Sequence, residues 1–168
     1  MKYELQVGMK NPILRKKSEN IVNFNSDIKK FEKTLIKNMK KYEGQGIAAP
    51  QIGENIRMVI CVLNKGKKQI TMCNPEILFF SKDKEYDQEG CLSLPNVWGD
   101  VNRSKSVLLK YQDVNGKSVQ LKLEGVNARV IQHEIDHLDG ILFLDRVEGE
   151  FSISKDADLK KLQISNND

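Results

Sequence analysis

Two histidines spaced one helical turn apart constrain this chain more than any other feature. His133-Glu134-Ile135-Asp136-His137 fits the H-E-x-x-H pattern within a helical stretch, Gly125 to Leu138, and Gly140 is placed to cap that helix. Residues four apart share a helix face, about 6 Å apart along the axis, so both imidazoles can bind one ion. Glu134 lies about 100° around the helix from His133, within reach of a water on that ion. The motif therefore predicts a hydrolytic metal site.

The other side of this helix is apolar, as packing into a core requires. Ile131, Ile135 and Leu138 lie away from the two histidines. The alternative is an exposed helix whose histidines pair with neighbouring acids. Because these are the only two histidines in the chain and both lie within the motif, we favour the metal site.

A catalytic site of this type needs a third protein ligand and one open position. The chain has no third histidine, and Phe143 stands where the extended motif H-E-x-x-H-x-x-G-x-x-H has its last one. The third ligand must therefore be Cys, Asp or Glu. Cys61 and Cys73 lie in apolar, strand-like segments, where packing in the core explains them better.

Cys91 differs from the other two cysteines because it lies between Gly90 and Pro95. Glycine lets the backbone approach a site closely, so a thiolate here could complete the set with His133 and His137. We favour Cys91. The competing interpretation is a thermolysin-like peptidase site, in which a carboxylate after the motif binds the metal. Its candidates are Glu148, Glu150, Asp156 and Asp158.

The rest of the chain is predicted to form one more long helix and several antiparallel strands. Apolar residues at helical spacing predict a helix that Ser26 or Asp27 caps and that ends near Gly44. The apolar run at 58–63 predicts a strand buried on both faces, followed by a hairpin to a strand at 69–73. The further strands are expected at 76–81, after a break at Pro75, and at 106–113 and 117–123, around Asn115-Gly116.

This order of elements predicts an α+β fold, in which antiparallel strands pack around the central C-terminal H-E-x-x-H helix. A length of 168 residues has room for one domain of ordinary size. We expect a single catalytic domain over residues 1–147 and a polar C-terminal tail over residues 148–168.

Composition narrows the possible partners. The chain has 27 basic and 23 acidic residues, its lysines look scattered between acids, and only five basic residues are arginines. A solvated lysine-rich surface is the expected result, with no specific nucleic-acid partner, although attraction to a ribosome surface stays open. No apolar run approaches the ~18 residues of a membrane span, and the N-terminus lacks the apolar core of a signal peptide. We expect a cytoplasmic protein without a disulfide framework, because its three cysteines are an odd number.

A loop rich in small residues, Gly44-Gln45-Gly46-Ile47-Ala48-Ala49-Pro50-Gln51, follows the first helix. It lacks the Gly-Lys-Ser/Thr of a phosphate-binding loop. Its glycines and alanines let the backbone approach either the core or an extended ligand, and Gln51 can donate hydrogen bonds to an oxyanion. On this segment alone, a loop that ends a helix is the simpler interpretation.

Taken together, three segments resemble the three signature motifs of the peptide deformylase family in order and spacing. They are Gly44–Gln51, Glu89–Pro95 and Gln132–Gly140. Asn11–Arg15 and Val101–Arg103 are also similar, and the resemblance covers about the first 147 residues. It implies a hydrolase that removes the formyl group from the initiator methionine of nascent chains and releases formate.

The resemblance also implies roles for individual residues. Cys91, His133 and His137 would bind one divalent metal ion, Fe(II) first and Zn(II), Ni(II) or Co(II) as alternatives, and Glu134 would be the acid/base. Gln51 and the backbone N–H of Leu92 would form the oxyanion hole. Gly46 would pair with an extended formyl-methionyl peptide. The further substrate-binding candidates are Gln45, Glu89, Gly90, Val126, Arg129 and Val130.

Two of these positions depart from the usual family pattern. Gln45 stands where an aliphatic residue is common, and Arg129 replaces a residue that is usually apolar. Val126 and Val130 are candidates for the methionine pocket on their own evidence, because they share a helix face with both histidines. Two rival interpretations remain, namely a metallopeptidase with a downstream carboxylate ligand and a non-enzymatic metal or ribosome-associated binding protein.

Overall fold

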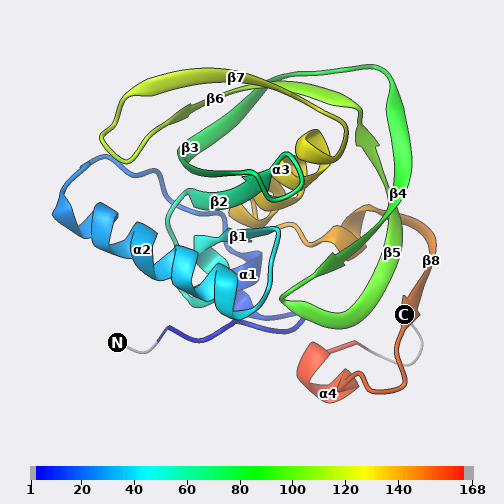
Figure 1. Cartoon of the computed structure of the whole chain (residues 1–168). Helices are drawn as coiled ribbons and strands as arrows, with labels where there is room; N and C mark the ends of the chain where they lie inside the picture. The colour runs from blue at the N-terminus through cyan, green and yellow to red at the C-terminus, as the bar shows by residue number, and fades with distance from the viewer. Residues whose placement is uncertain (1–2, 165–168) are drawn as a thin grey trace.

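The computed structural model describes residues 3–164, in which two antiparallel sheets enclose a central helix (Figure 1). The α+β prediction is confirmed. The five-stranded sheet has the order β1 (Gly46–Ala48), β2 (Met58–Leu63), β3 (Lys68–Phe80), β6 (Ser106–Gln112) and β7 (Ser118–Glu124). The three-stranded sheet has the order β4 (Lys84–Cys91), β5 (Leu94–Ser104) and β8 (Val147–Ile153). The helices are α1 (Pro12–Arg15), α2 (Ser26–Lys41), α3 (Gly125–Leu138) and α4 (Leu159–Leu162), with the short 3-10 helices η1 (Ala49–Ile52) and η2 (Phe143–Arg146).

Helix α3 has the predicted bounds and packs against one face of the five-stranded sheet. Its buried side includes Ala128, Ile131 and Leu138, which lie against strands β2, β3, β6 and β7. Gly140 follows its end with a φ of 75°, and a Cβ there would lie 2.5 Å from the carbonyl oxygen of Arg15. Glycine is therefore required for conformation and for space.

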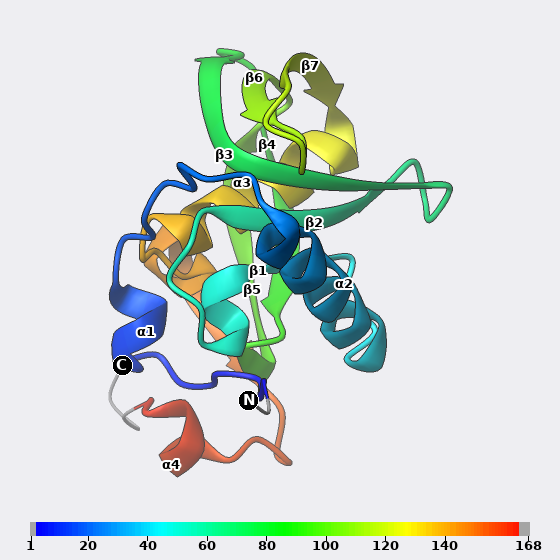
Figure 2. The same cartoon turned by 90° about the vertical axis from the view of Figure 1, so that its left-hand side faces the viewer.

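Helix α2 covers the opposite face of the same sheet, as Figure 2 shows. Its N-cap is Asn25, one residue before the predicted cap, and the Asn25 side chain accepts hydrogen bonds from the N–H groups of Asp27 and Ile28. Strand β2 is buried on both faces as predicted, because Val59 and Cys61 face the α3 side and Ile60 faces the α2 side. No helix within residues 3–164 is long and apolar enough to cross a lipid bilayer.

The predicted strand break at Pro75 is wrong, because β3 continues through it from Lys68 to Phe80. The pairing with β6 shifts register between Cys73 and Glu76, so Pro75 lies in a bulge where no ladder hydrogen bond is needed. Asn74 has a φ of 50° there, and its side chain bonds the backbone N–H and C=O of Ile21. The bulge thus joins the sheet to the N-terminal segment.

Strands β4, β5 and β8 were not predicted, and β8 changes the view of the C-terminal segment. The expected boundary between residues 147 and 148 falls inside β8, which pairs with β5 through Val97–Ile153 and Val101–Val147. Beyond it, Leu162 and Ile164 are buried in the core cluster of the three-stranded sheet. Residues 165–168 of the expected tail lie outside the described range.

Candidate metal centre and cleft

Three candidate metal ligands come together from two elements. Helix α3 carries His133 and His137, and Cys91 ends strand β4 immediately before the two-residue turn to β5. The Sγ of Cys91 lies 3.2 Å from Nε2 of His137, and the ligand atoms of all three residues lie within 4.8 Å of one another. Within residues 3–164, no other group of His, Cys, Asp or Glu side chains has this proximity.

None of the four competing downstream carboxylates belongs to the group that can hold a metal ion, and two of them have other contacts. The carboxylate of Glu148 accepts a hydrogen bond from the Tyr86 hydroxyl on the outer side of the three-stranded sheet. Asp158 caps α4 by accepting from the N–H of Lys161 at 3.1 Å.

The three cysteines differ in their acidity. Burial raises the pKa of the Cys61 thiol well above its ordinary value and that of Cys73 to about 12, so both stay protonated core residues. Burial also tends to raise the pKa of the Cys91 thiol. The charges of His137 and His133 and their hydrogen bonds have a larger effect, and they hold this pKa well below its ordinary value. Only Cys91 is thus set up to be a thiolate, the form that binds metals.

The donor set fits a divalent transition metal. One thiolate and two imidazoles form a mixed ligand set of the kind found in catalytic zinc and iron sites. The Nδ1–H of His133 donates a hydrogen bond to Oε2 of Glu89 at 2.9 Å, so Nε2 of the same ring is left to bind a metal. Among the residues that the structure describes, Nδ1 of His137 and Oε2 of Glu134 are buried without a hydrogen-bond partner.

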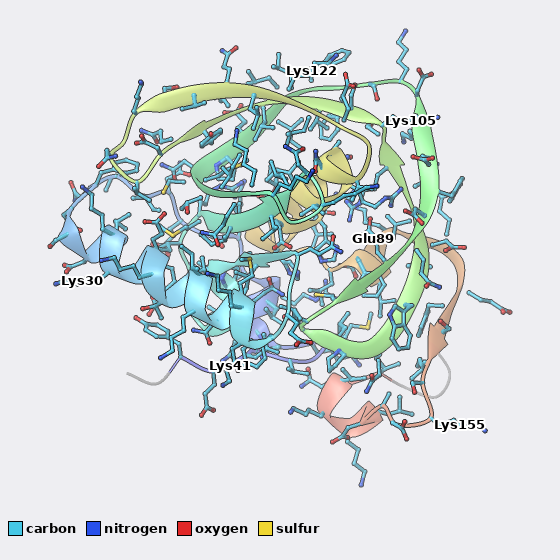
Figure 3. The ribbon with its side chains drawn as sticks, viewed as in Figure 1. Lys30, Lys41, Glu89, Lys105, Lys122 and Lys155 are labelled. Atoms are coloured by element: carbon cyan, nitrogen blue, oxygen red, sulfur yellow. The ribbon has the colours of Figure 1, made fainter. Side chains whose placement is uncertain are left out.

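A buried charge network lies beside His133 and is centred on Glu89 of β4, which bonds His133 of α3 and Arg103 of β5 (Figure 3). Arg103 donates from Nε and Nη2 to the two carboxylate oxygens of Glu89, both at 3.0 Å, and from Nη1 to Asp136. Arg146 binds the other oxygen of Asp136 at 2.7 Å. Burial alone would raise the pKa of Glu89, but the hydrogen bonds from His133 and Arg103 and the charge of Arg103 hold it well below the usual range.

Glu134 lies beside the candidate ligands, and burial raises its pKa to about 7 despite the opposing effect of His133 and His137. A carboxylate with a pKa near 7 can both accept and release a proton at neutral pH. Its neighbour across the cleft is Gly46, where a Cβ would lie 2.8 Å from Cδ of Glu134. Glycine at position 46 is therefore a requirement of close packing against the carboxylate.

Strand β1 presents a free backbone edge to the cleft. It is the edge strand of the five-stranded sheet, and Val62 donates to the carbonyl of Gln45 at 2.8 Å. Because antiparallel pairs alternate, the N–H and C=O of Gly46, opposite Cys61, point away from β2. These two groups remain available for a strand added at this edge.

Gln51 reaches the same centre from η1. Its Oε1 accepts from the N–H of Ala48 at 2.8 Å, which orients its amide nitrogen toward Ser93 Oγ, 3.1 Å away, and Cys91 Sγ, 3.7 Å away. Leu92 and Ser93 form the turn between β4 and β5, and the Ser93 N–H points to Cys91 Sγ at 3.4 Å. The predicted oxyanion donors therefore lie next to the candidate metal ligands.

A cleft of about 610 Å³ opens over these groups, and the remaining candidates line it. They are Gln45, Glu89, Gly90, Val126, Arg129 and Val130. Arg129 is held by the protein itself, since it donates to Glu89 at 2.8 Å and to the backbone carbonyls of Val101 and Glu85.

Sequence reasoning missed three residues of this site, namely Arg103, Ser93 and Trp98. Trp98 lies at the rim of the cleft across Gly90, where a Cβ would lie 3.0 Å from Trp98 Cδ1. Arg103 lies in the Val101–Arg103 segment that resembles the family. Its ion pair with Glu89 could not be predicted, because it depends on the pairing of β4 with β5.

Known proteins resemble this chain over most of its length. The family model of polypeptide deformylase matches residues 6–151. Peptide deformylase 2 of Gloeobacter violaceus is 42% identical over 145 residues, which cover 84% of this chain and 78% of that protein. The peptide deformylase of Heliobacterium modesticaldum is 40% identical, over 88% of this chain and 95% of that protein.

Solved structures agree with the sequence relatives. The crystal structure of peptide deformylase from Thermotoga maritima superimposes with a TM-score of 0.84 at 38% identity, covering 89% of this chain and 99% of that one. A peptide deformylase from Synechococcus elongatus in complex with actinonin gives a TM-score of 0.83 at 35% identity, covering 88% of this chain and 80% of that one.

Proposed function

The chain belongs to the polypeptide deformylase family, and on that premise we propose how its own residues remove a formyl group. The enzyme is a hydrolase that cleaves the N-formyl amide of the initiator methionine of new polypeptides and releases formate. The observation that carries the assignment of residues is the cluster of Cys91, His133 and His137 beside Glu134.

Cys91, His133 and His137 would hold one divalent ion, and Fe(II) is the ion we expect, with Zn(II), Ni(II) or Co(II) as substitutes. The softness of a thiolate and the borderline character of two imidazoles support these metals over Mg(II) or Ca(II). When bound, the ion supplies Lewis-acid activation of a water molecule and of the formyl carbonyl.

Glu134 moves the protons of the reaction. As the attacking water adds to the formyl carbon, Glu134 accepts its proton, and it passes this proton to the amine nitrogen when the C–N bond breaks. The products are formate and a free methionyl amine. A pKa of about 7 suits both halves of this cycle, since neither transfer is strongly uphill at neutral pH.

Gln51 and the N–H of Leu92 stabilise the oxyanion that develops on the formyl oxygen. The bond from the Ala48 N–H to Oε1 holds the Gln51 amide with its nitrogen toward Cys91 and Ser93, so this donor faces the site before substrate binds. Losing one donor of this kind typically costs about 10²–10³ in rate.

The formyl-methionyl peptide would lie along the edge of β1 and pair with the N–H and C=O of Gly46. Gln45 and Gly90 border this path, and the methionine side chain would enter between Val126 and Val130. Glu89 and Arg129 support the site differently. Their polar groups are occupied by protein partners, so they position His133 and the β4 wall of the cleft instead of binding substrate.

Glu134→Gln tests this assignment. The variant keeps the shape of the side chain but has no carboxylate to accept a proton, so we expect metal content like that of the unaltered enzyme and at least a 10²-fold loss of kcat. Gln120→Glu, at an exposed position on β7, is the control, and it should keep the activity of the unaltered enzyme. Full formate release by Glu134→Gln would contradict the role of Glu134.

A further inference from the structure

Helix α2 gathers on one face the lysines that look scattered in the sequence. Its outer face carries six lysines, all exposed: Lys29, Lys30, Lys33, Lys37, Lys40 and Lys41. At 100° per residue they fall within an arc of about 120°, opposite Phe31, Leu35 and Met39, which face the core. We call these six residues the lysine ridge; it extends over roughly 18 Å at 1.5 Å per residue.

Helix α2 itself carries little negative charge that could offset the ridge. Helix α2 has only two acids, of which Asp27 pairs with Lys30 at 3.1 Å and Glu32 accepts a hydrogen bond from Thr71 on the sheet. Lys29, Lys33, Lys37 and Lys40 make no ion pair with any residue between 3 and 164. Figure 3 labels Lys30 and Lys41 near the two ends of α2, and Lys41 donates to the Tyr42 hydroxyl at 3.3 Å.

The ridge leads directly into the substrate cleft. Helix α2 ends at Lys41, and Glu43, Gly44, Gln45 and Gly46 form one wall of the cleft. A partner bound along the ridge would therefore lie next to the entrance through which a peptide reaches the metal centre.

We propose that the lysine ridge of α2 docks this enzyme on the phosphate backbone of structured RNA, the polyanion that surrounds a nascent chain as it leaves the ribosome. The inference rests on the nascent-chain substrate and adds a partner surface to it. Lysine ammonium groups bind phosphates as point charges, so the contact positions the enzyme without reading sequence.

Charge and shape favour RNA over other occupants. A symmetric contact with a second copy of the chain would bring two ridges of like charge together, which is repulsive. A helix that lies in a membrane interface needs an exposed apolar face beside its basic face, and the apolar face of α2 is buried against the sheet. Phosphates along a nucleic-acid backbone need only an extended row of cations.

The test compares two variants that each lose four positive charges. Lys29, Lys33, Lys37 and Lys40 are changed to Gln in the ridge variant, and the exposed Lys82, Lys84, Lys105 and Lys155 are changed to Gln in the control. Binding to a fluorescein-labelled 20-base-pair RNA duplex is measured by anisotropy between 50 and 200 mM salt. Co-sedimentation with ribosomes, flotation with phosphatidylserine vesicles and formate release from a soluble formyl-Met peptide are measured on the same samples.

The four ridge lysines that make no ion pair, contacting one phosphate each, give a slope of about −3.6 for log K against log salt, or about a 150-fold loss of affinity between 50 and 200 mM. We expect this slope for the unaltered protein and for the control variant. The ridge variant should lose both the salt-dependent RNA binding and the co-sedimentation with ribosomes. Equal RNA binding by both variants, no RNA binding by the unaltered protein, or preference for the vesicles would each overturn the proposal. Formate release stays equal in all three proteins, so a failure of docking is distinct from a failure of the deformylase assignment.

Discussion

Gly46→Ala tests the geometry between the edge strand and the catalytic carboxylate. The added methyl group would lie 2.8 Å from Cδ of Glu134 and 2.9 Å from its Cγ, whereas ordinary van der Waals contact begins at 3.4 Å. Gly46 is buried, and the atom nearest to the added methyl group would be Oε1 of Glu134, closer still than Cδ, so this carboxylate oxygen has to retreat by about 1 Å. A displacement of about 1 Å in a catalytic group can cost about 10² in rate.

We therefore expect Gly46→Ala to bind its metal normally but to lose about 100-fold in kcat for formate release. Gly149→Ala is the matched control, because a Cβ there has no neighbour within 4 Å. Its φ of 104° makes that substitution strained, so it destabilises the fold without touching Glu134. Full turnover by Gly46→Ala, or an equal loss in Gly149→Ala, would refute the steric argument.

Three further variants test the ligands, the charge network and the C-terminal segment. Cys91→Ser should lose most of its bound metal while Glu148→Gln keeps it; the reverse result in metal analysis would favour the peptidase-like site. Glu89→Gln breaks a buried ion pair and should lower the free energy of unfolding by about 3–5 kcal/mol and weaken metal binding about 10–100-fold. Because the pKa of Glu89 is lowered in the fold, its contribution is present above about pH 4.3 and lost as the pH falls. Denaturant titrations should therefore show a steeper acid loss in the unaltered protein than in Glu89→Gln, and parallel curves would contradict this. Leu162→Ala should cost about 2–5 kcal/mol, since Leu162 is buried; a change near zero in thermal unfolding would show that the segment after β8 is dispensable.

Much of the fold could be predicted where local periodicity and burial agree. Helix α3 and strand β2 carry apolar residues at the spacing of their structures, and the two faces of β2 pack on different helices. The β4–β5 hairpin could not be found in this way. Strand β4 reads Lys-Glu-Tyr-Asp-Gln-Glu-Gly-Cys and buries mainly Glu89, so it is held by pairing and by a charge network instead of an apolar face.

The same contrast applies to the site. Cys91 could be singled out because two histidines needed a third ligand and the other cysteines stood in apolar runs. The sequence placed Glu89 at the site, because it lies two residues before Cys91, but it predicted that Glu89 binds the substrate. Its partners, Arg103 and His133, are 14 and 44 residues away along the chain, and only the paired strands bring them together.

The most direct test of the account is formate release from a formyl-Met peptide by protein purified without oxygen and analysed for metal. The account predicts one divalent ion per chain, formate produced in step with free methionyl amine, and no cleavage of the next peptide bond. A fully metallated protein that releases no formate, or that cleaves internal peptide bonds instead, would contradict it.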